Sequence, residues 1–282
     1  MNTLNDMAVL RARAQRTETP CGDGVLAWHR WGPADGRPVL LLHGGSGSWT
    51  HWVRNIEPLA RAGHAVWVPD LPGFGESAPP PDGHDADVLP GWLESGLQAL
   101  VGSTPVDLVG FSFGALVAGL WAQARPSRVA RLVLVGSPAL SADRLPPLDL
   151  RRWEDLPAGA AREAVHRHNL LQLMLAREES ASALAVALHA ANVERDRLRK
   201  RRLMLTDSMA LLLPHVRCPV WGLWGAQDVL YRHRLPLIAQ VLARAPGFQS
   251  LDIAPQAGHW VQFEAAEAFN AALASALSAP MG

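Results

Sequence analysis

The sequence predicts an α/β fold in which a mostly parallel, doubly wound sheet is covered by helices on both faces. Short apolar runs that suit strands buried on both faces alternate with helix-like segments through most of the 282 residues. This alternation is typical of repeated strand–helix–strand units. Apolar residues make up 49% of the chain and charged residues 18%, so the composition allows a core large enough for such a sheet.

The elements of the first half follow one another at short intervals. Residues 25–31 (VLAWHRW) alternate in polarity and are expected to form an early strand, and residues 38–42 (PVLLL) form a continuous apolar run. Further strands are expected at 65–68, 106–109 and 129–135, with helices at 51–62, 88–101 and 115–124.

The alternation of strands and helices stops after residue 136 and resumes near residue 219. Between these points no convincing strand is present, and helices are expected at 158–175, 179–192 and 194–209. The pattern is then completed by strands at 219–224 and 249–253 and by helices at 232–243 and 264–277. We therefore predict a core domain built from residues 1–137 and 216–282, with a helical cap at 138–215.

The strongest chemical signal is GFSFG at residues 110–114, between an apolar strand and a helix. A serine on such a sharp turn is held in strained backbone geometry with its hydroxyl exposed. The flanking glycines leave room for the tight turn, and the start of the helix offers free N–H groups. We therefore predict Ser112 as a nucleophile.

A serine hydroxyl needs a base, and that base needs an orienting group. His259 lies in QAGHW, just after the last expected strand, in a loop at the carboxyl edge of the sheet. Asp228 lies in WGAQD, in another loop that follows a strand, and the order serine, aspartate, histidine is the one expected for this layout. Asp252 is the competing acid but lies within a strand, and the position after strand 129–135 holds Ser137 rather than an acid.

Acyl transfer also requires donors for the developing oxyanion. The segment LHGGSG at 42–47 follows an apolar strand, and its glycines let a backbone N–H approach a substrate. We expect the N–H groups of Gly45 and Phe113 to form the oxyanion hole, with Gly44 as the alternative to Gly45. His43 is expected to brace this loop, because His259 already supplies the base.

These motifs together resemble the α/β-hydrolase superfamily over nearly the full chain. The resemblance is carried by LLHGGSGSW (41–49), DLPGFGES (70–77), GFSFG (110–114), WGAQD (224–228) and GHWVQFE (258–264). It implies an α/β-hydrolase fold, a helical cap inserted after the sixth strand, and a triad formed by Ser112, Asp228 and His259. Asp70 is interpreted as part of a structural loop of the family.

Within the superfamily, GHWVQFE and the overall layout resemble the meta-cleavage-product hydrolases, which split carbon–carbon bonds in the degradation of aromatic compounds. The chain departs from that subfamily at two points. Phe111 stands where the subfamily usually has asparagine, and the region where its cap arginine would lie reads AAN at 190–192. Both departures favour a less charged ester over a polar dienoate.

The substrate pocket is expected to be largely apolar. Gly44, Trp49, Phe111 and Trp260 adjoin the catalytic loops in the sequence and are predicted to line it. Some cap residues are possible contacts, although helix surface or cap core is the more common role: His166, His168, Asn169, Met174, His189 and Asn192. The basic run RDRLRKRR at 195–202 is interpreted as a solvated helix face, with an anion contact as the minority interpretation.

Composition argues against several other classes. The 26 basic and 26 acidic side chains balance, so there is no electrostatic case for a nucleic-acid or acidic-membrane partner. No metal-ligand cluster, phosphate-binding loop or dinucleotide fingerprint is present, and the two cysteines, Cys21 and Cys218, are expected to be reduced thiols. We expect a cytoplasmic protein without cofactor, metal or membrane span that acts on a small molecule; its oligomeric state stays open.

The sequence favours a cofactor-independent serine hydrolase that cleaves a small, largely apolar carboxylic ester or related acyl compound through an acyl-enzyme. Carbon–carbon hydrolysis of the meta-cleavage-product type is the first alternative, and rapid loss of a dienoate chromophore would distinguish it. A non-catalytic ligand-binding protein on the same fold is the second, and tight binding with sluggish turnover would indicate it.

Overall fold

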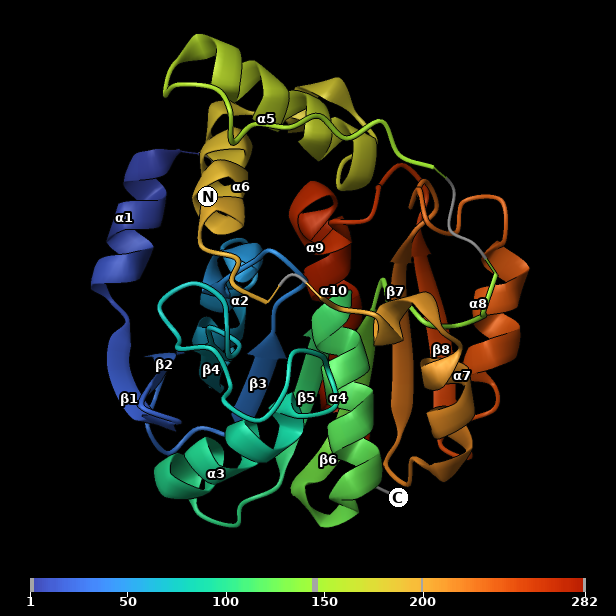
Figure 1. Ribbon diagram of the computed structural model, residues 1–282. Coiled ribbons are helices and arrows are strands. Elements are labelled where there is room, and N and C mark those ends of the chain that lie inside the picture. Colours follow the sequence, from blue (N-terminus) through green and yellow to red (C-terminus); the bar gives the residue numbers. More distant parts are fainter. Residues whose placement is uncertain (1–2, 144–146, 199, 281–282) are drawn as a thin grey trace.

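A single eight-stranded sheet runs through the computed structural model, which describes residues 3–143, 147–198 and 200–280 (Figure 1). Its strand order is β1-β2-β4-β3-β5-β6-β7-β8. The pairs β1–β2 and β2–β4 are antiparallel, and all later neighbours are parallel. The strands are Gln15–Cys21 (β1), Gly24–Trp31 (β2), Pro38–Leu42 (β3), Ala65–Pro69 (β4), Val106–Phe111 (β5), Val129–Val135 (β6), Val220–Gly225 (β7) and Phe248–Ala254 (β8). The predicted α/β-hydrolase fold class is confirmed.

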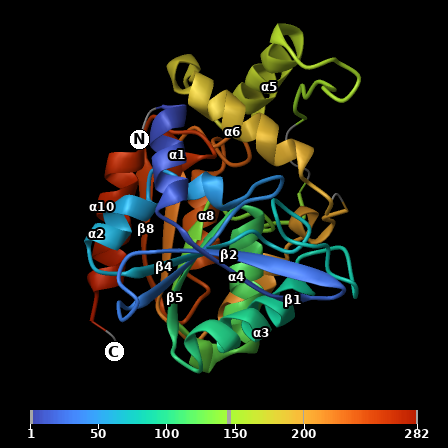
Figure 2. The ribbon, with the colours of Figure 1, turned by 90° about the vertical axis from the view of Figure 1, so that its left-hand side faces the viewer.

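Helices cover both faces of this sheet (Figure 2). One buried core contains apolar residues of α3, α4 and α8, and a second core on the opposite face contains those of α1, α2, α9 and α10. These helices are Leu4–Ala12 (α1), Ile56–Arg61 (α2), Leu89–Val101 (α3), Phe113–Ala124 (α4), Leu235–Leu242 (α8), Val261–Glu264 (α9) and Ala266–Ser278 (α10). Short 3₁₀ turns are formed by Trp49–Trp52, Pro126–Arg128, Glu178–Ser180, Leu203–Leu205 and Leu213–His215.

The central strands are buried because their side chains enter both cores in turn. On β5, Val106 and Leu108 belong to the core with α4, whereas Val109 and Phe111 belong to the core on the other face. Successive side chains of a strand point to opposite faces, so a strand covered on both sides is apolar at most positions. The exception on β5 is buried Asp107, which pairs with Arg37 at 2.7 Å and with Arg131 at 3.1 Å. The continuous apolar runs of the sequence follow from this arrangement.

The segment between β6 and β7 forms two separate groups of helices. Helices α5 (Ala160–Leu173) and α6 (Ala183–Glu194) pack together above the carboxyl edge of the sheet (Figure 1). Helix α7 (Ser208–Leu212) instead packs beside α4, where Met209 and Leu212 join the core. Within the described residues of 138–215 no strand is formed.

The helix expected at 194–209 is wrong. Helix α6 ends at Glu194, and most of the described residues before α7 are not helical. The Asp196 carboxylate accepts the Leu198 N–H at 3.0 Å, and the Arg197 N–H donates to Gly73 O at 2.9 Å. A local bond and a bond to a loop of the core thus replace helical bonds, so the basic run is not the solvated helix face that we expected. Arg199 lies outside the described residues.

Two elements gave no clear sequence signal. Strand β1 lies at the edge of the sheet, and five of its seven residues are exposed, so it lacks the apolar pattern of a buried strand. Helix α1 buries only Leu10 among its residues. In the described ranges of the chain, every helix is too short or too polar to cross a membrane.

Candidate active site

The three residues predicted as the triad lie at the carboxyl edge of the sheet. Ser112 follows β5, Asp228 follows β7 and His259 follows β8. Parallel strands place all their carboxyl ends at one edge, so loops that are far apart in the sequence meet there. This geometry brings together the side chains of residues separated by up to 147 positions.

Ser112 sits in a strained turn between β5 and α4. Its φ of 51° and ψ of −119° lie outside the regions that L residues commonly adopt. The turn is tight: a Cβ on Gly110 would lie 2.4 Å from Gly114 O, and one on Gly114 would lie 2.4 Å from His43 O. The Ser112 N–H donates to Val135 O at 2.8 Å, which fixes the turn to the neighbouring strand. The flanking glycines are therefore a steric requirement of the turn.

A continuous hydrogen-bonded chain links the three side chains. Ser112 Oγ lies 2.9 Å from His259 Nε2, and His259 Nδ1 lies 2.8 Å from Asp228 Oδ2. Because the carboxylate accepts the Nδ1 proton, Nε2 is left to accept the serine proton. Asp228 is fully buried, and its other oxygen accepts the Leu230 N–H at 3.0 Å. The competing acid, Asp252, is exposed on β8 and bonds to Ser250 instead.

The loop after β3 is fixed by two neutral histidines. His43 Nε2 accepts the Leu71 N–H at 2.8 Å, so its Nδ1 proton donates to Gly44 O at 2.8 Å. The Gly44 N–H in turn donates to His51 Nδ1 at 3.2 Å. Complete burial lowers the pKa of His43 to about 4 and that of His51 well below its ordinary value, so both rings are neutral at pH 7.

This network determines which N–H groups are available for an oxyanion. The Gly44 N–H is occupied by His51. Across the described ranges, the N–H groups of Gly45 and Phe113 have no recorded acceptor. Phe113 begins α4, where the first N–H groups of a helix lack partners within the helix. Both N–H groups predicted for the hole are thus without an acceptor among the described residues, and their binding of an oxyanion stays a prediction.

A cavity of about 530 Å³ lies above Ser112 and His259, beneath α5 and α6. Of the predicted pocket residues, Gly44 and Phe111 line it.

The two predicted tryptophans do not line the cavity. Trp49 packs against His29 and Trp31, with ring centroids 5.5 and 5.3 Å away. Trp260 stacks on Phe263 at 4.2 Å and donates its indole N–H to His51 O. Of the possible cap contacts, Asn169, Met174 and His189 line the cavity, whereas His166, His168 and Asn192 do not.

Arg201 lines the same cavity, and the sequence analysis missed it. Its Nη1 donates to Asp196 Oδ2 and to Leu198 O, both at 2.8 Å, and its Nη2 donates to Ser46 Oγ at 3.2 Å. A Cβ on Gly45 would lie 3.2 Å from its Nε, which is buried and has no acceptor among the described residues. The guanidinium therefore lies against the loop expected to bind the oxyanion. No periodicity marks this arginine within its basic run.

The side of the cavity formed by α5 and α6 also carries a histidine held neutral. Burial, with a smaller contribution from the neighbouring His166, lowers the pKa of His189 to about 4. The two rings lie 5.8 Å apart, and neither nitrogen of His166 has a hydrogen-bond partner in the part of the chain that the structure describes. The same part contains no group of three residues that could hold a metal ion.

The sequence matches the family model of the alpha/beta hydrolase fold over residues 37–266. The chain belongs to the α/β-hydrolase family. It is 27% identical to the 2-hydroxy-6-oxo-6-phenylhexa-2,4-dienoate hydrolase of Burkholderia cepacia over 83% of this chain and 85% of that one. It is 31% identical to 2-hydroxy-6-oxononadienedioate/2-hydroxy-6-oxononatrienedioate hydrolase 2 of Pseudomonas putida over 82% and 84% of the two chains. The predicted resemblance to meta-cleavage-product hydrolases is confirmed.

Solved structures with the same fold include a carboxylesterase and a meta-cleavage product hydrolase. The carboxylesterase CesB of Bacillus subtilis superposes with a TM-score of 0.77 at 20% identity, over 97% of this α/β-hydrolase chain and 95% of the other. The meta-cleavage product hydrolase of Pseudomonas fluorescens IP01 superposes with a TM-score of 0.75 at 20% identity, over 93% and 97%. At this identity the likeness establishes the fold, and family membership supports a hydrolase activity.

Proposed function

We propose that this protein is a serine hydrolase that needs no cofactor and cleaves a small carboxylic ester with a largely apolar acyl group. The observation that carries the proposal is the unbroken chain from Ser112 Oγ through His259 to buried Asp228, with both hydrogen bonds shorter than 3 Å. A nucleophile, a base and an orienting acid within hydrogen-bond reach are the requirements for acyl transfer.

In the proposed reaction, Ser112 Oγ attacks the ester carbonyl carbon and passes its proton to His259 Nε2. The carbonyl oxygen becomes an oxyanion that accepts hydrogen bonds from the N–H groups of Gly45 and Phe113. Collapse of this adduct breaks the bond to the alcohol oxygen, which receives the proton from His259. Water, activated by the same histidine, then releases the acyl group from Ser112.

The apolar side chains of the triad cavity support an apolar acyl group. Phe111, Leu173, Met174 and Leu230 line it together with the nucleophile. Each of the three arginines among its described lining residues has a carboxylate partner: Arg201 pairs with Asp196 at 2.8 Å, Arg152 with Asp155 at 3.2 Å and Arg151 with Asp149 at 3.8 Å. A cavity of this kind favours burial of apolar substrate surface over capture of a free anion.

We further propose that residues 138–215 act as a cap on a core formed by residues 1–137 and 216–282. The position of α5 and α6 above the carboxyl edge supports this division, because both helices contribute residues to the cavity over Ser112. The packing of α7 on α4 indicates that the end of the segment anchors the cap to the core.

Carbon–carbon hydrolysis of a dienoate is the second candidate. The curated relatives at 27% and 31% identity are named as such hydrolases, and Arg201 provides a cation in the same cavity as Ser112. Against it, Phe111 precedes the nucleophile, and the guanidinium of Arg201 is already engaged by Asp196.

Two substrates, each assayed separately, distinguish ester hydrolysis from carbon–carbon hydrolysis. We would measure kcat/KM for p-nitrophenyl butyrate and for a 2-hydroxy-6-oxo-6-phenylhexa-2,4-dienoate, the second by loss of its chromophore. The proposal predicts clear ester turnover and slow loss of the dienoate. A dienoate kcat/KM well above the ester value would replace the ester assignment with carbon–carbon hydrolysis.

A further inference from the structure

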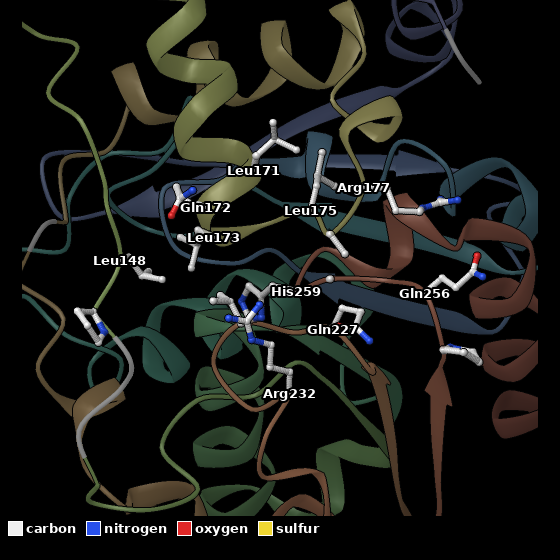
Figure 3. Close-up of a pocket in the computed structure, with 15 residues that line it drawn as sticks. Leu148, Leu171, Gln172, Leu173, Leu175, Arg177, Gln227, Arg232, Gln256 and His259 are labelled. Atoms are coloured by element: carbon white, nitrogen blue, oxygen red, sulfur yellow. The ribbon is translucent and has the colours of Figure 1, made fainter.

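A second cavity, of about 750 Å³, adjoins the triad cavity at His259 (Figure 3). It lies between the end of α5 and the loops that follow β7 and β8, and Ser112 does not line it. Leu148, Leu173 and His259 line both cavities, so they form the boundary between the two. His259 thus lies at the boundary between the space above the nucleophile and a second, separate space.

The second cavity differs from the first in its charges. Two arginines, Arg177 and Arg232, line it, and none of its described lining residues is an aspartate or glutamate. Three glutamines add amide donors: Gln172, Gln227 and Gln256. In Figure 3 the side chain of Arg232 extends toward His259. The lining is therefore cationic and rich in hydrogen-bond donors.

Arg232 is the cation that is available to a ligand. Arg177 already pairs with Glu264 at 3.6 Å and with Glu179 at 3.7 Å. Among the described residues, no carboxylate lies within 4.0 Å of the Arg232 guanidinium, and its Nε donates to His233 Nε2 at 3.2 Å. An exposed arginine without an acidic partner retains its full attraction for an anion.

We propose that this second cavity holds the leaving part of the substrate and that this part carries a carboxylate, which Arg232 binds. The inference rests on the proposed ester hydrolysis. When the tetrahedral adduct collapses, the carbon–oxygen bond breaks, the electron pair stays with the alcohol oxygen, and His259 Nε2 gives its proton to that oxygen. The alcohol must therefore lie against His259, and the space that continues from His259 is the cationic cavity.

The division of the site assigns each half of the substrate by its chemistry. The acyl group lies in the apolar cavity above Ser112, under the cap. The alcohol, with its carboxylate, lies between the end of α5 and the loops after β7 and β8. A cationic surface beside the departing group also attracts anionic substrates from solution, and this attraction weakens as salt rises.

Two matched esters test this proposal: the butyrate ester of 4-hydroxybenzoate and that of 4-hydroxybenzamide, each rate divided by its uncatalysed hydrolysis. We expect kcat/KM to be about fivefold higher for the carboxylate ester at low salt, as a partly exposed ion pair allows. Arg232→Gln should remove this preference, and Arg232→Glu should invert it. Arg244→Gln is the control, because it makes the same change in net charge at an exposed position outside the cavity.

Each outcome decides a different claim. Equal kcat/KM values for the two esters in the wild type contradict only the binding of a carboxylate in the cationic cavity, as does a preference that survives Arg232→Gln. Hydrolysis of neither ester contradicts the proposed function instead. In that case calorimetry with free 4-hydroxybenzoate still decides the inference: binding that exceeds that of the amide and disappears in Arg232→Gln supports the cavity, and equal binding overturns it.

Discussion

The two sides of the triad cavity are held in different ways. On the core side, Ser112, Asp228 and His259 follow strands of a sheet buried on both faces, and each is fixed by short hydrogen bonds. On the cap side, Asn169 and His189 reach the cavity from α5 and α6, which pack on each other outside the sheet. Elements with fewer contacts to the buried core open and rearrange more easily than the core itself. The core side therefore sets the chemistry, and the cap side is where specificity can change.

The largest expected effect is on the core side. Ser112→Ala should lower kcat/KM by about five orders of magnitude for every ester tested, because triad members act as a unit. The loss should not depend on the acyl group. Steady-state kinetics with p-nitrophenyl esters of two to eight carbons checks this, and circular dichroism confirms the fold of the variant. A loss that varies strongly with chain length would assign Ser112 to substrate binding instead.

Glu264 joins the two sides, and its removal should reduce stability. Its buried carboxylate accepts N–H groups from Gly258, beside His259, and from Ala176 and Arg177, which follow α5. A glutamine at this position cannot accept all three, so Glu264→Gln should lower the free energy of unfolding by about 2–4 kcal/mol. Urea unfolding measures this, with exposed Glu267→Gln as the control. Equal midpoints for the two variants would show that the junction contributes little.

Arg201 also connects the core to the segment after α6, and its replacement should have a smaller effect. It connects Ser46, next to Gly45, to Asp196 in the segment after α6. Arg201→Met keeps the packing on Phe74 and Phe113 but removes these bonds, so kcat should fall about tenfold while KM changes little. The neighbouring exposed Arg202→Gln is the control. A fall through KM alone would indicate that Arg201 binds substrate in its ground state.

The smallest expected effect concerns pH and the cap. The pKa of His189 is lowered by burial to about 4, below the value of about 6.5 for an unfolded chain. Below pH 6.5 the unfolded state therefore binds more protons, and stability is lost as pH falls toward 4. His189→Leu should reduce the loss between pH 7 and pH 5 by about 1 kcal/mol, whereas exposed His215→Leu should not. An unchanged pH slope in His189→Leu would contradict its neutral state.

The sequence predicted the core side well because its signals are local. An apolar strand followed by a glycine-rich turn identifies a loop at the carboxyl edge of the sheet. The position of such a loop depends on its own strand and little on the rest of the chain. Asp228 and His259 could be placed in this way, as could the steric need for Gly110 and Gly114.

Helices α5 and α6 were predicted, at 158–175 and 179–192, but the segment after α6 was not, because tertiary contacts override helix propensity there. The segment after α6 bonds to Gly73 and Ser46 of the core, which draws Arg201 into the cavity. The direction of side chains could not be predicted from the sequence either. Trp49 adjoins the oxyanion loop in sequence, but its ring packs against His29 and Trp31. Adjacency along the chain does not determine which face of a turn a side chain occupies.

The most direct test of the central claim is to trap the acyl-enzyme. The protein would be mixed with excess p-nitrophenyl butyrate, quenched in acid within milliseconds, digested and analysed by mass spectrometry. We expect a butyryl adduct on the peptide that contains Ser112, together with a burst of one p-nitrophenol per active site. An adduct on a different residue, or the same yield of adduct in Ser112→Ala, would contradict nucleophilic catalysis by Ser112.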